Sequence, residues 1–315
     1  MSRPSIAFIF PGQGSQSVGM GRELASNYPV AQRTFDEADA ALGYRLSELY
    51  FNGPEEKLNL TEITQPAILT VSVAALRVLH EKGIAPDYVA GHSLGEYSAH
   101  VAAGTLDFAD AVRTVRNRGK YMQEAVPVGV GAMAAVLGMP ISELQKVCDE
   151  AAQSVDGVCA PANINSPDQI VISGSKLAVE RAIEMSKGRS AKRAILLQVS
   201  APFHCALMQP AQERLAADLA ALRFHPMQLP LVKNIDGAIT RDSAQARQAL
   251  IDQVTGAVQW VKSMQNLIAL GVASFVEVGP GKVLCGLMRQ IDRSKTCINV
   301  EDEASLEKTL GQLAG

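Results

Sequence analysis

The sequence lacks the features that mark secreted, membrane-spanning and nucleic-acid-binding proteins. Its five cysteines are odd in number and form no Cys-x-x-Cys pair, so neither disulfides nor a structural zinc site is expected. A net charge of −3 argues against a general nucleic-acid-binding surface. The apolar run at residues 6–10 is too short for a signal peptide, and the longest uncharged stretch, residues 125–139, is shorter than the roughly 20 residues of a membrane helix. We therefore expect a cytoplasmic protein with no membrane span.

The sequence does have the composition of a globular protein, with 47% hydrophobic and 19% charged residues. Its 315 residues suffice for one large domain or two unequal ones. Strand-like runs rich in Val, Ile and Phe alternate with longer Ala-rich segments of helical period, which indicates an α/β protein with parallel strands. The clearest predicted elements are strands at 6–10, 88–90 and 274–278 and helices at 21–42 and 65–82.

The middle of the chain has a different pattern. It predicts two short strands between two helices, with one further strand on each side, in the order βαββαβ of a ferredoxin-like unit. The elements are a strand at 132–138, a helix at 141–153, two strands ending at 170–173, a helix at 176–187 and a strand at 194–199. The chain returns to α/β elements afterwards, so we predict a small domain at 129–199 inserted into a large domain formed by 1–128 and 200–315.

The strongest chemical signal is Gly-His-Ser-Leu-Gly at residues 91–95, a match to the G-x-S-x-G nucleophile elbow. A predicted strand precedes it and a helical stretch follows, as that motif requires. The glycines allow the close backbone approach of a strained turn, which exposes the hydroxyl of Ser93. The Leu94 amide and the helix N-terminus would face a developing oxyanion.

A nucleophilic serine needs a base, and the chain has five histidines. His92 is adjacent to Ser93 on a tight turn, and His100 lies about 10 Å further along the predicted helix. His80 and His225 occupy positions typical of the surface. His204 remains, just after the last strand of the middle segment, although position alone leaves a structural role equally open.

Four motifs in order carry a family resemblance. They are Pro-Gly-Gln-Gly-Ser-Gln at 11–16, Gly-His-Ser-Leu-Gly-Glu-Tyr at 91–97, Arg-Gly-Lys-Tyr-Met-Gln at 118–123 and Glu-Val-Gly-Pro-Gly at 277–281. With these motifs the chain closely resembles, over nearly its whole length, the malonyl-CoA:acyl carrier protein transacylases of the dissociated bacterial fatty-acid synthase. The resemblance implies an α/β-hydrolase-like large domain that carries a ferredoxin-like small domain, with the active site between them.

The resemblance also implies roles for individual residues. Ser93 would be the nucleophile and His204 its base, and the backbone amides of Gln13 and Leu94 would form the oxyanion hole. In this family a main-chain carbonyl orients the histidine in place of a carboxylate. The matching position here is assigned to Gln259, so no triad acid is expected.

Arg118 carries the expectation about the substrate. A malonyl group has a free carboxylate, which a guanidinium can hold with two parallel hydrogen bonds. From the residues alone Arg118 would more readily be a surface arginine of a basic helix, and the resemblance assigns it the substrate role. In related polyketide acyltransferases, Phe before the histidine goes with malonyl and Ser with methylmalonyl; Phe203 agrees with malonyl, but fatty-acid members tolerate either residue there.

The implied reaction is a ping-pong transfer of malonyl from malonyl-CoA to the phosphopantetheine thiol of acyl carrier protein, in fatty acid biosynthesis, through a malonyl-serine. It needs no metal or redox cofactor, and we expect a monomer. Whether the pathway is fatty acid or polyketide synthesis stays open. The acidic carrier protein would dock on a basic patch, and one candidate is Lys187, Arg189, Lys192 and Arg193, which a solvated charged turn explains equally well.

Two alternatives remain at this point. A serine hydrolase would place a triad acid between Ser93 and His204 in the sequence, where Asp149, Glu150 and Asp156 lie, but all three are in the predicted inserted unit. A carrier-protein-binding module without catalysis is the second alternative. The presence of serine, histidine and arginine together argues against it.

Overall fold

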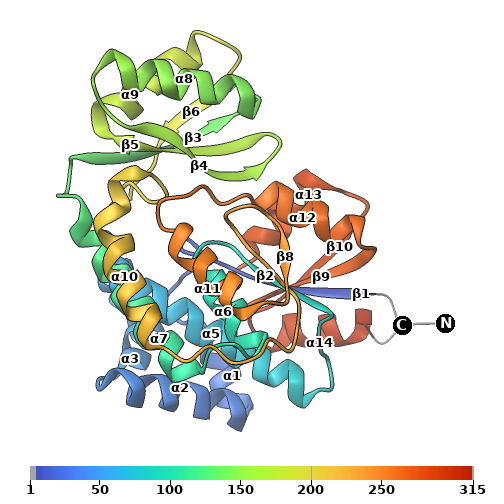
Figure 1. Cartoon of the computed structure of the whole chain (residues 1–315). Coiled ribbons are helices and arrows are strands. Elements are labelled where there is room, and N and C mark those ends of the chain that lie inside the picture. Colours follow the sequence, from blue (N-terminus) through green and yellow to red (C-terminus); the bar gives the residue numbers. More distant parts are fainter. Residues whose placement is uncertain (1–4, 200, 314–315) are drawn as a thin grey trace.

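The computed structural model describes residues 5–199 and 201–313; Ser200, where the predicted large domain resumes, lies outside the described residues. The fold is mixed α/β. Figure 1 shows two parts, a larger one below and a smaller one above, each built on its own sheet.

The sheet of the larger part has six strands in the order β10-β9-β1-β2-β7-β8. These strands are β1 (Ser5–Phe10), β2 (Tyr88–Gly91), β7 (Leu231–Val232), β8 (Ile239–Thr240), β9 (Val272–Val278) and β10 (Thr296–Val300). Every pairing is parallel except β7 with β8. Five of the six residues of β1 are buried, as expected for a central parallel strand covered on both faces. The predicted parallel α/β core is therefore present, and β7, β8 and β10 were not predicted.

Helices cover both faces of this sheet (Figure 1). They are α1 (Arg22–Asn27), α2 (Pro29–Leu42), α3 (Leu46–Asn52), α4 (Glu55–Leu58), α5 (Thr61–Glu81), α6 (Gly95–Ala102), α7 (Phe108–Ala125), α10 (Gln209–Ala221), α11 (Ser243–Asp252), α12 (Trp260–Ala269), α13 (Val283–Ile291) and α14 (Glu303–Leu313), with a 3-10 turn at Ala206–Met208. The single helix predicted at 21–42 is divided, because Tyr28 is extended and Pro29 starts a new helix.

Helix α5 is the one described helix with the length and composition of a membrane span. Of its most apolar 18-residue window, 83% is buried inside the protein. It packs mainly against α7 and α2. These are the properties of a central core helix.

The smaller part has a four-stranded antiparallel sheet in the order β4-β5-β3-β6. Along the chain its elements are β3 (Gly131–Leu137), α8 (Ile141–Ser154), β4 (Cys159–Ser166), β5 (Gln169–Ser175), α9 (Lys176–Lys187) and β6 (Arg193–Leu196). Both helices pack on one face of the sheet, and a separate apolar core lies between them (Figure 1). The predicted βαββαβ order is confirmed.

Strand β4 ties the two parts together. The amide of Ile164 donates to the Val258 carbonyl at 2.9 Å, and the Val258 amide donates to the Ala162 carbonyl at 2.8 Å. Between the nucleophile turn and β4, His92 Nε2 lies 2.8 Å from Asn165 Oδ1. These hydrogen bonds hold β4 in a fixed position next to the end of β2.

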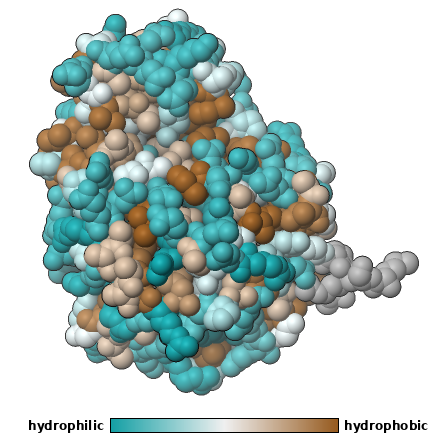
Figure 2. Space-filling view, in the orientation of Figure 1, coloured by the Kyte–Doolittle hydropathy of each residue, from teal (hydrophilic) through white to brown (hydrophobic). Residues whose placement is uncertain are grey.

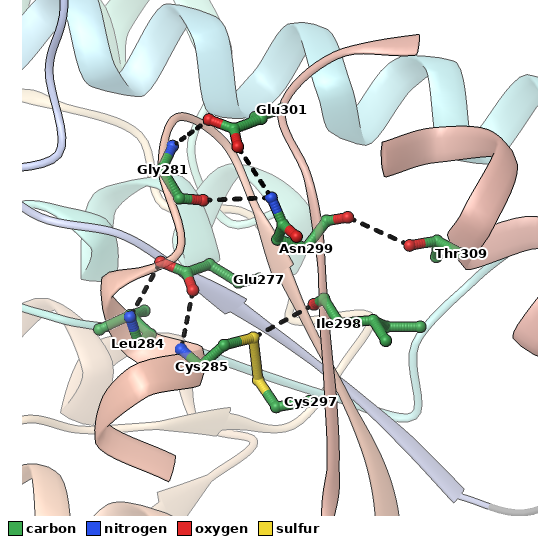
Figure 3. Close-up of a disulfide and its surroundings, with 9 residues drawn as sticks. All are labelled: Glu277, Gly281, Leu284, Cys285, Cys297, Ile298, Asn299, Glu301 and Thr309. Carbon is green, nitrogen blue, oxygen red and sulfur yellow. Dashed lines mark hydrogen bonds between the residues drawn. A yellow bond between two sulfur atoms is a disulfide. The ribbon is translucent and has the colours of Figure 1, made fainter. Parts of the chain in front are cut away.

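Contrary to the prediction, Cys285 and Cys297 form a disulfide (Figure 3). It links the first turn of α13 to β10, with the Cα atoms 5.2 Å apart. The prediction was wrong because an odd number of scattered cysteines does not exclude a single pair, and because β10, which brings Cys297 beside α13, was not foreseen. Glu277 accepts hydrogen bonds from the Leu284 and Cys285 amides in the same turn. The other cysteines are buried free thiols.

Candidate active site

The G-x-S-x-G segment forms the sharp turn that was predicted from its glycines. Strand β2 ends at Gly91 and α6 begins at Gly95. A Cβ on Gly91 would lie 1.9 Å from the Gly95 carbonyl, and a Cβ on Gly95 would lie 2.1 Å from the Phe10 oxygen. Between them Ser93 adopts φ 51°, a left-handed conformation that costs free energy in a non-glycine residue. Only glycine at both flanks permits this turn.

The structure brings Ser93 and His204 together. Ser93 Oγ is 2.7 Å from His204 Nε2, and His204 Nδ1 is 2.8 Å from the main-chain oxygen of Gln253. Because a carbonyl oxygen only accepts, Nδ1 carries the hydrogen and Nε2 is free to accept the serine proton. This is the arrangement of a nucleophile with its general base.

The carbonyl that orients His204 belongs to Gln253, so the assignment to Gln259 was wrong. Gln259 donates its amide to the Asn234 carbonyl, and its own carbonyl accepts from Ser263. Gln253 directly follows α11, and the end of that helix delivers its carbonyl to the imidazole. The path of this loop could not be read from the residues.

Burial keeps His204 neutral. Loss of solvation, followed by the positive charge of Arg118, lowers the pKa of the imidazole to about 3. An opposing contribution from its hydrogen bond to Gln253 is smaller. The base is therefore unprotonated at neutral pH.

Arg118 is a core residue, only 1% exposed, and not the surface arginine that its basic helix suggested. Its Nη1 donates to Gln65 Oε1 and its Nη2 to Gln253 Oε1, both at 2.9 Å. Nη2 also lies 3.1 Å from Ser93 Oγ. Gly119 permits this burial, because a Cβ there would lie 2.6 Å from the Thr61 carbonyl oxygen. The guanidinium is held by neutral oxygens beside the nucleophile, so its charge is available to an anionic ligand.

Three polar residues that were not predicted as site residues lie around the serine turn: Asn234, Glu96 and Gln253. Asn234 Oδ1 accepts from the Ser93 amide at 2.7 Å, and its Nδ2 donates to the Gly91 carbonyl at 2.6 Å. Glu96 Oε2 accepts from Gln253 Nε2 at 2.6 Å. Glu96 belongs to the quoted motif at 91–97, which was the one available signal for it. Asn234 and Gln253 lie far away in the chain and carried none.

Ser93, Arg118 and His204 face a cavity of about 620 Å³ between the two parts. Its lining combines Ser93, Arg118 and His204 with neutral amide side chains: Gln13, Gln16, Asn59, Gln65, Asn163, Asn165, Gln169 and Gln198. Among the described lining residues, Arg118 is the one permanent charge. The cavity therefore suits an uncharged, amide-containing chain that ends in an anion.

Gln13 and Leu94, expected to supply the oxyanion hole, both line this cavity. Within residues 5–199 and 201–313, neither backbone amide has a hydrogen-bond acceptor. Gly12 lets the chain pass close to the turn, because a Cβ there would lie 2.4 Å from the His92 oxygen. The two amides are thus free to bind an oxygen of a ligand.

The candidate triad acids of a hydrolase lie elsewhere. Asp149 and Glu150 are on α8 of the smaller part, where Glu150 pairs with Arg189. Asp156 follows the same helix. The Nδ1 atom of His204 is occupied by a carbonyl, so none of the three has the role that a hydrolase triad requires.

Apolar residues gather on the surface near the junction of the two parts (Figure 2). Brown residues occur across the middle of this face and at the side of the smaller part, between predominantly teal regions. Val199 and Val283, which line the cavity, are 38% and 51% exposed. The rim of the cavity is therefore partly apolar and accessible from solvent.

The model of the acyl transferase domain family matches residues 7–313. A malonyl CoA-acyl carrier protein transacylase of Salmonella typhimurium is 51% identical over 98% of this chain and 99% of its own length. Its Bacillus subtilis counterpart is 49% identical over 98% and 97%.

Solved structures agree with the sequence matches. An acyl carrier protein S-malonyltransferase from Vibrio cholerae superposes with a TM-score of 0.94 at 47% identity, covering 97% of this chain and 99% of its own. A malonyl-transacylase in complex with its type II PKS acyl-carrier protein gives a TM-score of 0.95 at 47% identity, with 98% and 99% covered. The chain therefore belongs to the malonyl CoA-acyl carrier protein transacylase family of acyl transferases.

Proposed function

We propose that this enzyme transfers the malonyl group from malonyl-CoA to the phosphopantetheine thiol of acyl carrier protein in fatty acid biosynthesis. The observation that carries the substrate assignment is the buried Arg118 guanidinium, 3.1 Å from Ser93 Oγ. It can hold the malonyl carboxylate while the thioester carbon lies at the serine. An acyl group without a carboxylate would leave this buried charge without a counterion.

In the first step His204 Nε2 takes the Ser93 proton as Oγ attacks the malonyl thioester carbon. The backbone amides of Gln13 and Leu94 bind the developing oxyanion. The carbon–sulfur bond then breaks, His204 returns the proton to the coenzyme A thiolate, and malonyl-Ser93 remains. The Gln253 carbonyl stabilises the imidazolium that forms between the two proton transfers.

The second step reverses the first with a different thiol. His204 takes the proton of the phosphopantetheine thiol, whose sulfur attacks the ester carbon of malonyl-Ser93. Ser93 Oγ leaves and regains its proton from His204, so the enzyme returns to its starting state. Neither step needs a metal or a redox cofactor.

We also propose that the larger part, residues 1–128 and 200–315, is an α/β-hydrolase-like domain and that residues 129–199 are a ferredoxin-like domain inserted into it. The parallel sheet with a serine at the end of β2 and the βαββαβ order support this description. We further propose a cytoplasmic monomer that binds neither nucleic acid nor membrane.

Intact-protein mass after mixing with malonyl-CoA, and separately with acetyl-CoA, tests the function. The wild type should gain a malonyl adduct, and Ser93→Ala should gain none. Arg118→Ala should lose at least about 100-fold in the malonyl acylation rate, because two charge-assisted hydrogen bonds are removed, and should no longer prefer malonyl. No wild-type adduct, or equal acylation by the two donors, would contradict the proposal.

A further inference from the structure

Glu96 is a buried acid that bonds to no cation within residues 5–199 and 201–313. It lies in the first turn of α6, three residues after Ser93, and is completely inaccessible to solvent. Its Oε2 accepts from Gln253 Nε2 at 2.6 Å and from the Asn234 amide at 3.2 Å, while Oε1 has no partner in the described part of the chain. Burial raises its pKa to about 8, which reflects the free-energy cost of placing a carboxyl group here. The two hydrogen bonds to Oε2 offset part of this free-energy cost.

The hydrogen bond from Gln253 Nε2 to Glu96 Oε2 orients the side-chain amide of Gln253. Its Nε2 donates to Glu96 Oε2 and to the Ser93 carbonyl oxygen at 3.0 Å, with Asn234 Oδ1 as a third acceptor at 3.5 Å, and its Oε1 faces Arg118 Nη2. Turning the amide by 180° would place its oxygen against these acceptor oxygens and its NH₂ group against the guanidinium N–H. The amide therefore has one satisfactory orientation, and Glu96 Oε2, at 2.6 Å, is the nearest acceptor that holds it there.

The hydrogen bond from the Asn234 amide to Glu96 Oε2 links Glu96 to the serine turn. The Asn234 amide donates to Glu96, and the Asn234 side chain bonds both the Ser93 amide and the Gly91 carbonyl. Glu96 Oε2 thus connects Asn234, which supports the serine turn, with Gln253, which contacts both His204 and Arg118.

We propose that Glu96 is a positioning residue for malonyl selection, whose Oε2 fixes the Gln253 amide so that its oxygen holds Arg118 in place for the acyl carboxylate. This rests on the proposed function. Arg118 then keeps two neutral acceptors, from Gln65 and Gln253, and its charge stays free for the substrate. The required property is an acceptor oxygen, not a negative charge.

Two substitutions of Glu96 separate the effect of its acceptor oxygen from that of its negative charge. Glu96→Gln retains an acceptor oxygen of the same reach, whereas Glu96→Met has a similar length and no acceptor. Without this acceptor the Gln253 NH₂ group keeps only its longer contacts to Ser93 and Asn234, so the amide holds Arg118 less firmly, which disturbs the acyl carboxylate more than the thioester. We expect Glu96→Met to lose about tenfold in the ratio of malonyl to acetyl acylation, and Glu96→Gln to stay close to wild type.

The measurement is the time course of Ser93 acylation by malonyl-CoA and acetyl-CoA, followed by intact mass, with thermal unfolding in parallel. Ser98→Ala is the matched control, since it removes a buried hydroxyl of the same helix that has no partner in the described residues. A merely structural role of Glu96 would lower both rates equally and leave the ratio unchanged, which would overturn the proposal. Equal loss of the ratio in both Glu96 variants would also overturn it.

Gln253→Met keeps the inference testable if Glu96→Met does not fold, because it removes the amide and retains the main-chain carbonyl at His204. Its malonyl to acetyl ratio should fall to a similar extent, and the double variant should lose no more than either single one. An unchanged ratio in Gln253→Met contradicts the inference. The proposed function is tested separately, by the wild type: absence of a malonyl preference there refutes the function, whereas its persistence in Glu96→Met refutes the positioning role alone.

Discussion

At the scale of single residues, the site places ionisable groups where solvent cannot stabilise their charges. His204 and Arg118 are both almost fully buried and adjacent to the same serine. The loss of solvation and, to a smaller extent, the charge of Arg118 both disfavour the protonated form of the imidazole and lower its pKa. The site therefore holds one cation, which the substrate carboxylate can neutralise, and a neutral base.

The neutral base leads to a pH prediction. A free histidine titrates near pH 6.5, but the pKa of His204 lies at about 3, so the acylation rate should show no inflection near 6.5. In the unfolded chain the imidazole is charged below about 6.5, and since it stays neutral in the fold, it destabilises the fold progressively as pH falls from 6.5 toward 3.

The acylation rate should be measured between about pH 5.5 and 7.5, a range that spans the pKa of free histidine. Thermal unfolding checks the stability: from pH 7 to about 5 the wild type should lose more in Tm than His204→Gln, whose side chain carries no charge. A rate that halves near pH 6.5, or equal Tm losses in the two proteins, would show that His204 titrates normally.

At the scale of elements, the sequence predicted what depends on local pattern and missed what depends on loops. The elbow, the βαββαβ segment and β1 followed from periodicity and glycine placement. The division between α1 and α2 was missed, although Pro29 marks it. The Gln253 carbonyl was misassigned by six residues because only the tertiary path after α11 decides which peptide reaches His204. Short strands such as β7, with two residues, have too little pattern to be recognised.

The disulfide gives a prediction at this scale. Cys285 and Cys297 close a short loop between α13 and β10, 12 residues apart in sequence, and such a loop contributes about 3 kcal/mol in the chain-entropy account. Cys297→Ser should therefore lower Tm by several degrees under oxidising conditions. Alkylation of the denatured wild type should modify the three free thiols Cys148, Cys159 and Cys205 without reductant, and all five cysteines after reduction. Five modified thiols without reductant would show that the pair is open in solution.

At the scale of the whole molecule, two separately built sheets meet at one cavity. The larger sheet supplies the serine at the end of β2, and the smaller supplies an amide-bearing wall from β4 and β5. Sequence periodicity could predict both sheets. It could not predict the bonds between them, such as His92 with Asn165, because side chains distant in sequence meet there only after both parts have folded.

This arrangement places the candidate carrier-protein patch near the cavity. Lys187, Lys192 and Arg193 are exposed and form no ion pair in the described part of the chain, whereas Arg189 pairs with Glu150. Arg193 is the first residue of β6. Leu197, four residues further along the chain, lines the cavity, so the patch lies about 13 Å from the cavity at the usual rise of a strand. An acidic partner held at the patch would thus have the cavity mouth within reach of a flexible prosthetic arm.

Reversing two of these charges tests the patch. Lys187→Glu combined with Arg193→Glu should raise the KM for acyl carrier protein by about tenfold at low salt, because attraction to an acidic partner becomes repulsion, and should leave the KM for malonyl-CoA unchanged. Lys308→Glu, on α14 of the larger part, is the matched charge reversal away from the patch and should leave both constants unchanged. An unaltered carrier KM in the double variant would assign these residues to an ordinary solvated turn, and docking would then have to use another face of the cavity rim.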